Sequence, residues 1–179
     1  MEGVGVLAAD GSPGPLNHSC HVMPPKSAGV LPFRRRQGKV EVLLVHPGGP
    51  FWRNKDAGAW SIPKGEYGPD ETAEVAARRE FREELGADLT GTLVPLVEIR
   101  QRGGKLVTAF AVETDLDADT IVSNAFEIEW PPRSGRSQRF PEVDRAQWFD
   151  LATAYQKINA AQKALLEQLE LICSGVTKA

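Results

Sequence analysis

Three glutamates gather on one side of an expected helix near the middle of the chain, in the segment ARREFREELG. At about 100° per residue, positions i, i+3 and i+4 share one helix face, and Glu80, Glu83 and Glu84 have this spacing. Their carboxylates repel one another unless cations neutralise them. Oxygen ligands suit Mg²⁺ or Mn²⁺ rather than zinc, and no Cys or His lies in this stretch. The cluster indicates either a divalent-cation site or an acidic helix face in contact with solvent.

The residues around the cluster predict where this helix begins and ends. Asp70 is expected to cap its N-terminus, with Glu71 in the first turn, and Gly86 is expected to end it. Beside the carboxylates runs an apolar strip suited to packing on a sheet, formed by Ala77, Phe81 and Leu85. The helix is therefore expected to pack along one side and to leave the acidic side open.

Alternating apolar residues and turn signals predict strands before and after this helix. The expected strands are Ser27 to Arg34, Val40 to His46, Trp60 to Ile62, Leu93 to Gln101, Leu106 to Glu113, Ile121 to Trp130 and Gln147 to Phe149. A turn at Gln37-Gly38 joins the first two strands, and one long amphipathic helix is expected from Leu151 to Ile172. This order predicts an α/β domain with a mixed β-sheet between helices.

A longer pattern includes the acidic cluster. Its polar and glycine positions match the spacing G-x5-E-x7-R-E-U-x-E-E-x-G-U, where U is a bulky aliphatic residue, at Gly65, Glu71, Arg79, Glu80, Glu83, Glu84 and Gly86. The chain departs from it at Phe81 and Ala87, which stand at the two U positions. The flanking segments AGVLPFRR, VEVLLVHP and WSIPKG are also similar to the same family. The chain resembles the Nudix hydrolases, most specifically from Gly65 to Ala87.

This resemblance implies an α/β/α sandwich and metal-dependent hydrolysis of a phosphoanhydride bond in a nucleoside diphosphate-linked substrate. It implies Mg²⁺ or Mn²⁺ as cofactor, with the carbonyl group of Gly65 and three carboxylates as ligands, from Glu80, Glu83 and Glu84. It also implies that Arg79 orients a glutamate, and Glu71 is expected to make a supporting salt bridge. Glu83 is the first choice for the general base. Outside the helix, three acids remain open as base or ligand: Glu127, Glu129 and Glu142.

The residue before the first box glycine bears on the substrate. Lys64 resembles the PKG lead-in of diadenosine polyphosphate hydrolases, inositol pyrophosphate phosphatases and decapping enzymes. An added cation suits a longer phosphate chain, so the expected substrate is a dinucleoside polyphosphate. Trp52 is expected to stack on a base and Arg53 to meet phosphates. A nucleoside triphosphate pyrophosphatase is the alternative, and a catalytically silent binding module is less favoured because all box acids are present.

Composition narrows the possible partners. Lys and Arg number 21 against 24 Asp and Glu, a net charge of −3, which gives no sign of a nucleic-acid-binding surface despite the run Arg34 to Arg36. No apolar stretch approaches the roughly twenty residues of a membrane span. The two cysteines have no metal or redox spacing, which favours the reducing cytoplasm. The expected partner is a small-molecule nucleotide, and the oligomeric state is left open.

The start of the chain differs in composition from the rest. Residues 1–22 are rich in Gly, Pro and small residues and lack the basic and long apolar regions of a signal peptide. They are expected to form a flexible leader, followed by a Nudix domain at residues 23–179.

Overall fold

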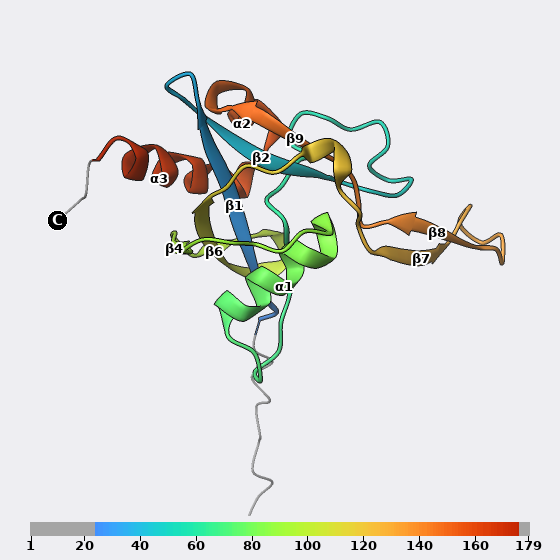
Figure 1. The fold of residues 1–179 in the computed structure, drawn as a ribbon. Coiled ribbons are helices and arrows are strands. Elements are labelled where there is room, and N and C mark those ends of the chain that lie inside the picture. The colour runs from blue at the N-terminus through green and yellow to red at the C-terminus, as the bar shows by residue number, and fades with distance from the viewer. Residues whose placement is uncertain (1–23, 176–179) are drawn as a thin grey trace, which may run out of the picture.

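Helices lie on both faces of one mixed β-sheet in the computed structural model, which describes residues 24–175 (Figure 1). The main path through the sheet runs in the order β4-β6-β1-β2-β9. These strands are β4 (Val94–Pro95), β6 (Leu106–Glu113), β1 (Lys26–Arg36), β2 (Lys39–Pro47) and β9 (Val143–Asp150). Two short strands complete the sheet, β3 (Lys64–Glu66) beside β1 and β5 (Ile99–Arg100) beside β6. The predicted α/β/α sandwich is confirmed, whereas the expected leader at residues 1–22 lies outside the described residues.

Strand β1 is the centre of the fold because it pairs with three others. It is parallel to β6 and antiparallel to β2 and β3. Its side chains alternate between two hydrophobic cores: Ala28 and Val30 face one, and Leu31 and Phe33 face the other. A strand that is covered on both faces reads as a continuous apolar run, as this one does.

Helix α1 (Ala73–Leu85) covers one face of the sheet (Figure 1). Its expected apolar strip is buried there, with Phe81 only 1% exposed. The expected cap at Asp70 is wrong: Thr72 is the N-cap, and its side chain accepts a hydrogen bond from the backbone N–H of Val75. Glu71 precedes the helix because its carboxylate bonds to Arg79, which keeps this part of the loop out of the first turn. Gly86 ends the helix in the left-handed conformation, as predicted.

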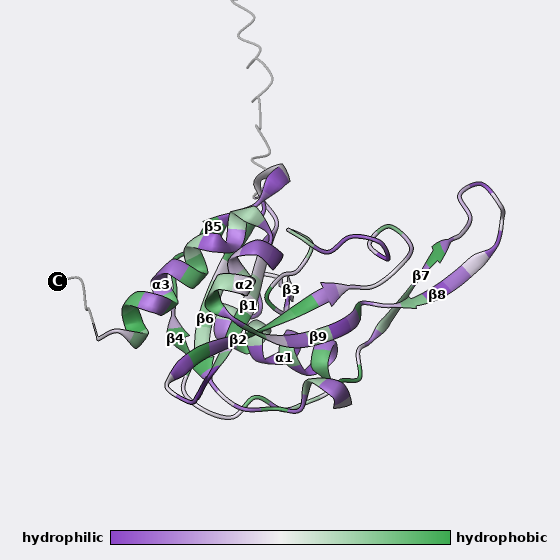
Figure 2. Ribbon diagram, turned by 90° about the horizontal axis from the view of Figure 1, so that it is seen from above, coloured by the Kyte–Doolittle hydropathy of each residue, from purple (hydrophilic) through white to green (hydrophobic). Residues whose placement is uncertain are grey.

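The opposite face is covered by helical segments near the C-terminus (Figures 1 and 2). The expectation of one long helix is wrong, because α2 (Leu151–Lys157) and α3 (Lys163–Cys173) are separated by an extended break and a 3₁₀ turn, η3 (Ala160–Gln162). The break follows from tertiary hydrogen bonds: Asn159 N donates to the carbonyl oxygen of Trp60 at 2.7 Å, and Trp60 N donates to that of Lys157 at 3.1 Å. The apolar periodicity continues across the break because both helices pack on the same core.

The remaining expected strands are present with altered bounds, except for the one expected from Trp60 to Ile62. The turn at Gln37-Gly38 joins β1 and β2, with positive φ at both residues. The segment from Leu93 to Gln101 forms two short strands, β4 and β5, and Trp60 and Ser61 form isolated bridges rather than a strand. The expected strand from Ile121 to Trp130 is shortened to β7 (Ala125–Glu129). None of the helices in residues 24–175 is long and apolar enough to cross a membrane.

Strand β7 pairs with a strand that the polar sequence did not signal, β8 (Ser137–Pro141). The two form a separate antiparallel hairpin that projects beyond the sheet (Figures 1 and 2). The base of this hairpin lies beside the open acidic face of α1, because Asn124 N donates to the carbonyl oxygen of Glu83 at 2.9 Å. The hairpin thereby forms one wall of the candidate site.

Candidate active site

The acidic face of α1 lines an open cavity of about 480 Å³. Four segments distant in sequence contribute to it: the end of β2 with the loop that follows, strand β3, helix α1 and the base of the hairpin. Its lining residues are Pro47, Gly48, Trp52, Lys64, Gly65, Glu66, Glu80, Glu83, Glu84, Phe126 and Glu142. The fold therefore brings together the three box carboxylates, the box glycine and one of the distant acids.

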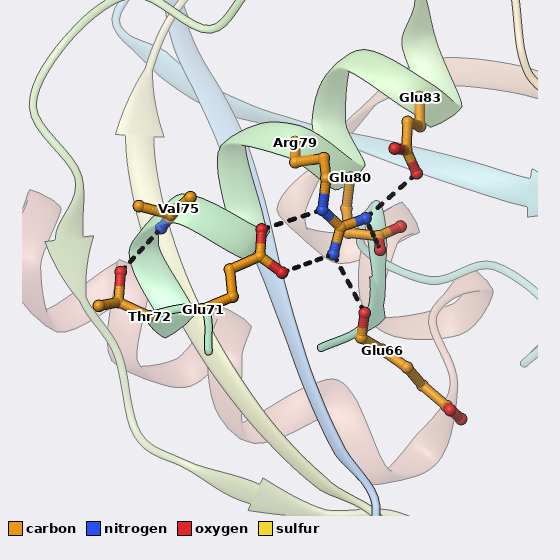
Figure 3. Close-up of polar contacts among 7 residues, drawn as sticks. All are labelled: Glu66, Glu71, Thr72, Val75, Arg79, Glu80 and Glu83. Atoms are coloured by element: carbon orange, nitrogen blue, oxygen red, sulfur yellow. Dashed lines mark hydrogen bonds and ion pairs between the residues drawn. The ribbon is translucent and has the colours of Figure 1, made fainter. Parts of the chain in front are cut away.

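Arg79 lies among the carboxylates of Glu71, Glu80 and Glu83 (Figure 3). Its guanidinium binds Glu71 through two hydrogen bonds of 3.0 and 2.9 Å, and it also contacts Glu80 at 2.5 Å and Glu83 at 3.2 Å. A fifth bond, of 3.1 Å, goes to the carbonyl oxygen of Glu66 on β3. The carboxylates raise the pKa of Arg79, so it remains a cation. Arg79 thus joins the loop before α1, the helix and β3 into one rigid unit, and Glu71 makes the expected salt bridge.

Gly65 is required by a close approach between β3 and α1. A Cβ atom built on Gly65 would lie 1.9 Å from Oε2 of Glu80, far inside any allowed contact. The Glu80 carboxylate therefore occupies the space that a side chain would take. The glycine permits this packing and leaves its own backbone beside the Glu80 carboxylate.

Lys64 and Glu84 meet at the inner wall of the cavity. The backbone N–H of Lys64 donates to Oε2 of Glu84 at 3.1 Å. Burial raises the pKa of Glu84 to about 8, with smaller contributions from Glu80 and Glu142, against the opposing effect of the Lys64 cation. Burial likewise lowers the pKa of Lys64. A cation that binds here must therefore compete with a proton on Glu84.

Burial also raises the pKa of Glu80, and the nearby charges of Glu83 and Glu142 act in the same direction, against the opposing effect of Arg79. Glu142 follows the hairpin, yet its charge reaches both Glu80 and Glu84. Repulsion among four carboxylates is costly in a partly buried cavity, and a bound divalent cation would offset it.

The donor set fits Mg²⁺ or Mn²⁺ in chemical type, since glutamates line the cavity and neither Cys nor His is among its lining residues. Within residues 24–175, however, no three acidic, His or Cys side chains converge as a ligand set. The guanidinium of Arg79 instead holds Glu80 and Glu83. Binding of a cation would therefore require these two carboxylates to exchange part of their contact with Arg79 for the metal.

The raised pKa of Glu84 predicts how a cation bound through this carboxylate would depend on pH. Its carboxyl group changes from a pKa of 4.5 to about 8 on folding, so its ionisation destabilises the metal-free fold as pH rises through this range. A cation binds only the ionised form, so we expect Mn²⁺ to raise the melting temperature more at about pH 9 than at about pH 6. In a Glu84→Gln variant, this difference between the two pH values should shrink. An equal Mn²⁺ effect at both pH values in the unmodified protein would contradict the expectation.

The other residues proposed for the site from sequence are divided among several places. Trp52 lines the cavity, whereas Arg53 lines a neighbouring hollow. Glu127 and Glu129 lie on β7 outside both, where Glu127 accepts a 3.4 Å hydrogen bond from Ser137 and Glu129 accepts one of 2.8 Å from the backbone of Gly135. Of the three distant acids, only Glu142 lines the cavity.

Four of the lining residues were not predicted as site residues from the sequence: Pro47, Gly48, Glu66 and Phe126. Glu66 directly follows the box glycine, and this position was a usable signal. Phe126 belongs to the strand whose alternation places Glu127 and Glu129 on its opposite face. Once Phe126 is assigned to the face that lines the cavity, this alternation places Glu127 and Glu129 on the face that points away from it.

The comparisons with known proteins agree with this arrangement. Residues 23–169 match the family model described as NUDIX domain. The chain is 21% identical to the Caenorhabditis elegans Ap4A hydrolase in a binary complex, with a TM-score of 0.61 over 83% of this chain and 98% of that one. It is 16% identical to a mutT/nudix family protein from Listeria innocua, with a TM-score of 0.58 over 86% and 96%.

A third solved structure is the NUDIX domain of Shewanella oneidensis NrtR complexed with ADP ribose, which is 18% identical, with a TM-score of 0.55 over 87% of this chain and 90% of that one. No curated protein matches the sequence. At these identities the solved structures show the fold alone, whereas the family model spans most of the chain. The chain therefore belongs to the Nudix family and is a hydrolase of nucleoside diphosphate derivatives.

Proposed function

We propose that this Nudix hydrolase cleaves a phosphoanhydride bond in a dinucleoside polyphosphate, with Mg²⁺ or Mn²⁺ as cofactor. Nudix hydrolases generally require divalent cations. The observation that carries the proposal is the presence of Lys64 and Trp52 in the same cavity as the box carboxylates. A cation and an aromatic ring beside the hydrolytic residues suit a substrate with a long phosphate chain and a base at its end.

A second hollow supports a substrate with two nucleosides. It has a volume of about 310 Å³, and its lining includes Arg53, Trp130 and Phe140. It adjoins the first cavity, because Gly48 and Glu142 line one while their neighbours Gly49 and Pro141 line the other. A base on aromatic residues here, with phosphates between the hollows, would fit a molecule longer than a mononucleotide.

Trp52 is well placed to bind a base. Its side chain lies on the loop after β2, and the residue is 37% exposed. The Nζ atom of Lys55 lies 4.6 Å from the centre of its ring, on a loop that also carries Arg53. An aromatic ring with a cation over one face is suited to a nucleotide, which joins a flat base to an anionic chain.

The residues of the chain can be assigned roles in hydrolysis. Glu83, whose side chain is 37% exposed, has the access needed to take a proton from an attacking water, and Glu142 is the second candidate. Arg79 holds Glu80 and Glu83 in place, and Lys64 contacts the phosphate chain. Glu80, Glu83, Glu84 and the carbonyl of Gly65 would hold the divalent cations, which would neutralise phosphate charge and activate water. The reaction needs no covalent enzyme intermediate.

The substrate assignment is tested by Lys64→Gln. Loss of the cation should harm hydrolysis of diadenosine tetraphosphate more than that of ADP-ribose, because the added phosphate contact exists only with the longer chain. We expect the ratio of kcat/KM values to change roughly five- to thirty-fold, which corresponds to about 1 to 2 kcal/mol.

The matched control is Lys39→Gln, which removes the same charge from an exposed residue at the start of β2. This variant should leave the ratio unchanged. Equal losses on both substrates in Lys64→Gln would reject the preference for dinucleoside polyphosphates. A wider panel that includes nucleoside triphosphates, assayed for metal-dependent release of nucleotide, would then identify a pyrophosphatase of the alternative kind.

A further inference from the structure

A buried histidine lies behind the loop that carries Trp52. His46 is near the end of β2, is 0% exposed and takes no part in the chemistry described above. Its Nδ1 lies 2.7 Å from Oδ1 of Asp144, and its Nε2 lies 2.8 Å from the carbonyl oxygen of Lys55. The ring therefore joins β2 to β9 on one side and to the loop after β2 on the other.

These two partners determine the protonation of the ring. A carbonyl oxygen can only accept a hydrogen bond, so Nε2 must carry a hydrogen. An ionised carboxylate can also only accept, so Nδ1 must carry one as well. A neutral imidazole has one N–H and can satisfy one of the two partners. The geometry is that of a doubly protonated, positively charged His46.

The surrounding charges agree with this state. On β9, Asp144 is 30% exposed in its side chain, and Nε of Arg145 lies 3.4 Å from the same Oδ1, so a cationic side chain lies beside this carboxylate. From the loop, Asp56 accepts a hydrogen bond of 2.9 Å from Trp60, whose ring lies edge-on to His46 at 5.2 Å. Lys157 of α2 pairs with Asp56 and so balances its charge. The carboxylate that contacts the imidazole ring is that of Asp144.

The hydrogen bond to Lys55 matters because the loop after β2 has few other attachments to the rest of the fold. Residues 48–58 are held at their ends, where Gly48 N donates to the carbonyl of Glu142 and Gly58 N to that of Gln156. Between them, among the described residues, the bond from His46 to Lys55 is the one hydrogen bond that ties residues 49–55 to another part of the fold. Lys55 N in turn donates to the carbonyl of Trp52 at 2.8 Å.

We propose that His46 is a positioning residue that acts, as an imidazolium, by fastening this loop so that Trp52 stays at the cavity. Loss of one ring proton leaves a single N–H for two acceptors, and the bond to Lys55 or the bond to Asp144 must break. The loop is therefore held while the ring carries both hydrogens, and it is released where one of them is lost. The effect on substrate rests on the proposed function, whereas the effect on the loop does not.

The first test uses the unmodified, substrate-free protein. Nitrogen-15 NMR of the histidine rings, followed from about pH 5 to about pH 9, should show both nitrogens of His46 protonated wherever the loop is protected. Over the same range, hydrogen exchange in residues 48–58 should become roughly tenfold faster relative to β6, as expected for loss of a charged hydrogen bond. Strand β6 in the same sample corrects for the intrinsic effect of pH on exchange. A singly protonated ring at pH 5, or loop protection that does not follow the ring, would overturn the proposal.

The second test uses Asp144→Asn and His46→Gln. The asparagine keeps an acceptor for Nδ1 but removes the negative charge, so the loss of loop protection should move to lower pH. Both N–H donors of the glutamine are on one nitrogen and its other terminal atom is an acceptor, so it cannot reproduce the two opposed ring N–H groups. Its loop should therefore exchange fast at every pH, about tenfold above the unmodified protein at low pH. If His46 only filled space, Asp144→Asn would not change the pH at which loop protection is lost, and His46→Gln would not make exchange of the loop fast at every pH.

Kinetics separate positioning from chemistry. With diadenosine tetraphosphate and Mg²⁺, we expect His46→Gln to raise KM about tenfold at low pH with a smaller change in kcat, since the box residues lie on α1 and β3. A fall in kcat with KM unchanged would contradict the assigned role. If no substrate is hydrolysed by the unmodified protein, the proposed function fails, and the NMR and exchange results still decide the role of His46.

Discussion

Replacement of Glu83 by glutamine is expected to lower kcat roughly 10²- to 10⁴-fold while the fold stays intact. The substitution keeps the size of the side chain and removes the charge that would bind metal or accept a proton. Glu83 is 37% exposed in its side chain and bonds to Arg79 at 3.2 Å, so little packing is lost. Turnover is measured with diadenosine tetraphosphate and Mg²⁺, and folding is monitored by thermal unfolding.

The matched control is Glu127→Gln. Glu127 is also an exposed glutamate, but it lies on β7 outside the cavity and bonds only weakly to Ser137, at 3.4 Å. This variant should keep nearly full turnover. A folded Glu83→Gln enzyme with near-normal kcat would exclude Glu83 as ligand or base and would shift attention to Glu142, which lines the same cavity.

Gly65→Ala should have the second largest effect, although it adds only one methyl group. The new Cβ would lie 1.9 Å from Oε2 and 2.0 Å from Cδ of Glu80, so the carboxylate must leave its place beside Arg79. A displacement of about 1 Å near the reacting groups can cost about 10²-fold in rate, and we expect a loss of that order. The melting temperature should also fall, because Glu80 is almost fully buried where it now lies.

Gly68→Ala provides the matched control, since a Cβ at Gly68 meets nothing within 4 Å. It should leave turnover and melting temperature nearly unchanged. In a Glu80→Ala background, Gly65→Ala should cause little further loss of kcat, because its effect passes through the Glu80 carboxylate. If the two substitutions instead lower kcat by factors that multiply in the double variant, Gly65 acts through its own backbone and not through Glu80.

The acidic face of α1 shows why part of this site could be predicted from the sequence. Helical geometry is local, so the spacing of Glu80, Glu83 and Glu84 places them on one face whatever the rest of the chain does. The left-handed end at Gly86 is local for the same reason. The cap was mistaken at Asp70 because the pairing of Glu71 with Arg79, eight residues away, decides where the helix begins.

The error in the C-terminal helix has a tertiary cause as well. The apolar spacing from Leu151 to Ile172 is helical, yet the chain leaves the helix at Ile158 because hydrogen bonds with Trp60 are available there. The periodicity of apolar residues indicates which side of a helix faces the core, and both α2 and α3 do pack on that core. It cannot report a break that distant backbone groups impose.

The sequence by itself determined the family, the sandwich fold and the set of box residues, because a motif of fixed spacing on a helix and alternation along strands are properties of neighbouring residues. Only the tertiary structure decided which distant groups join them. It brought Glu142 into the cavity and left Glu127 and Glu129 outside, since the pairing of β7 with β8 sets which face of the hairpin meets α1. It likewise placed Asp144 and Lys55 against His46, ninety-eight and nine residues away, contacts that depend on strand pairing and on the path of a loop.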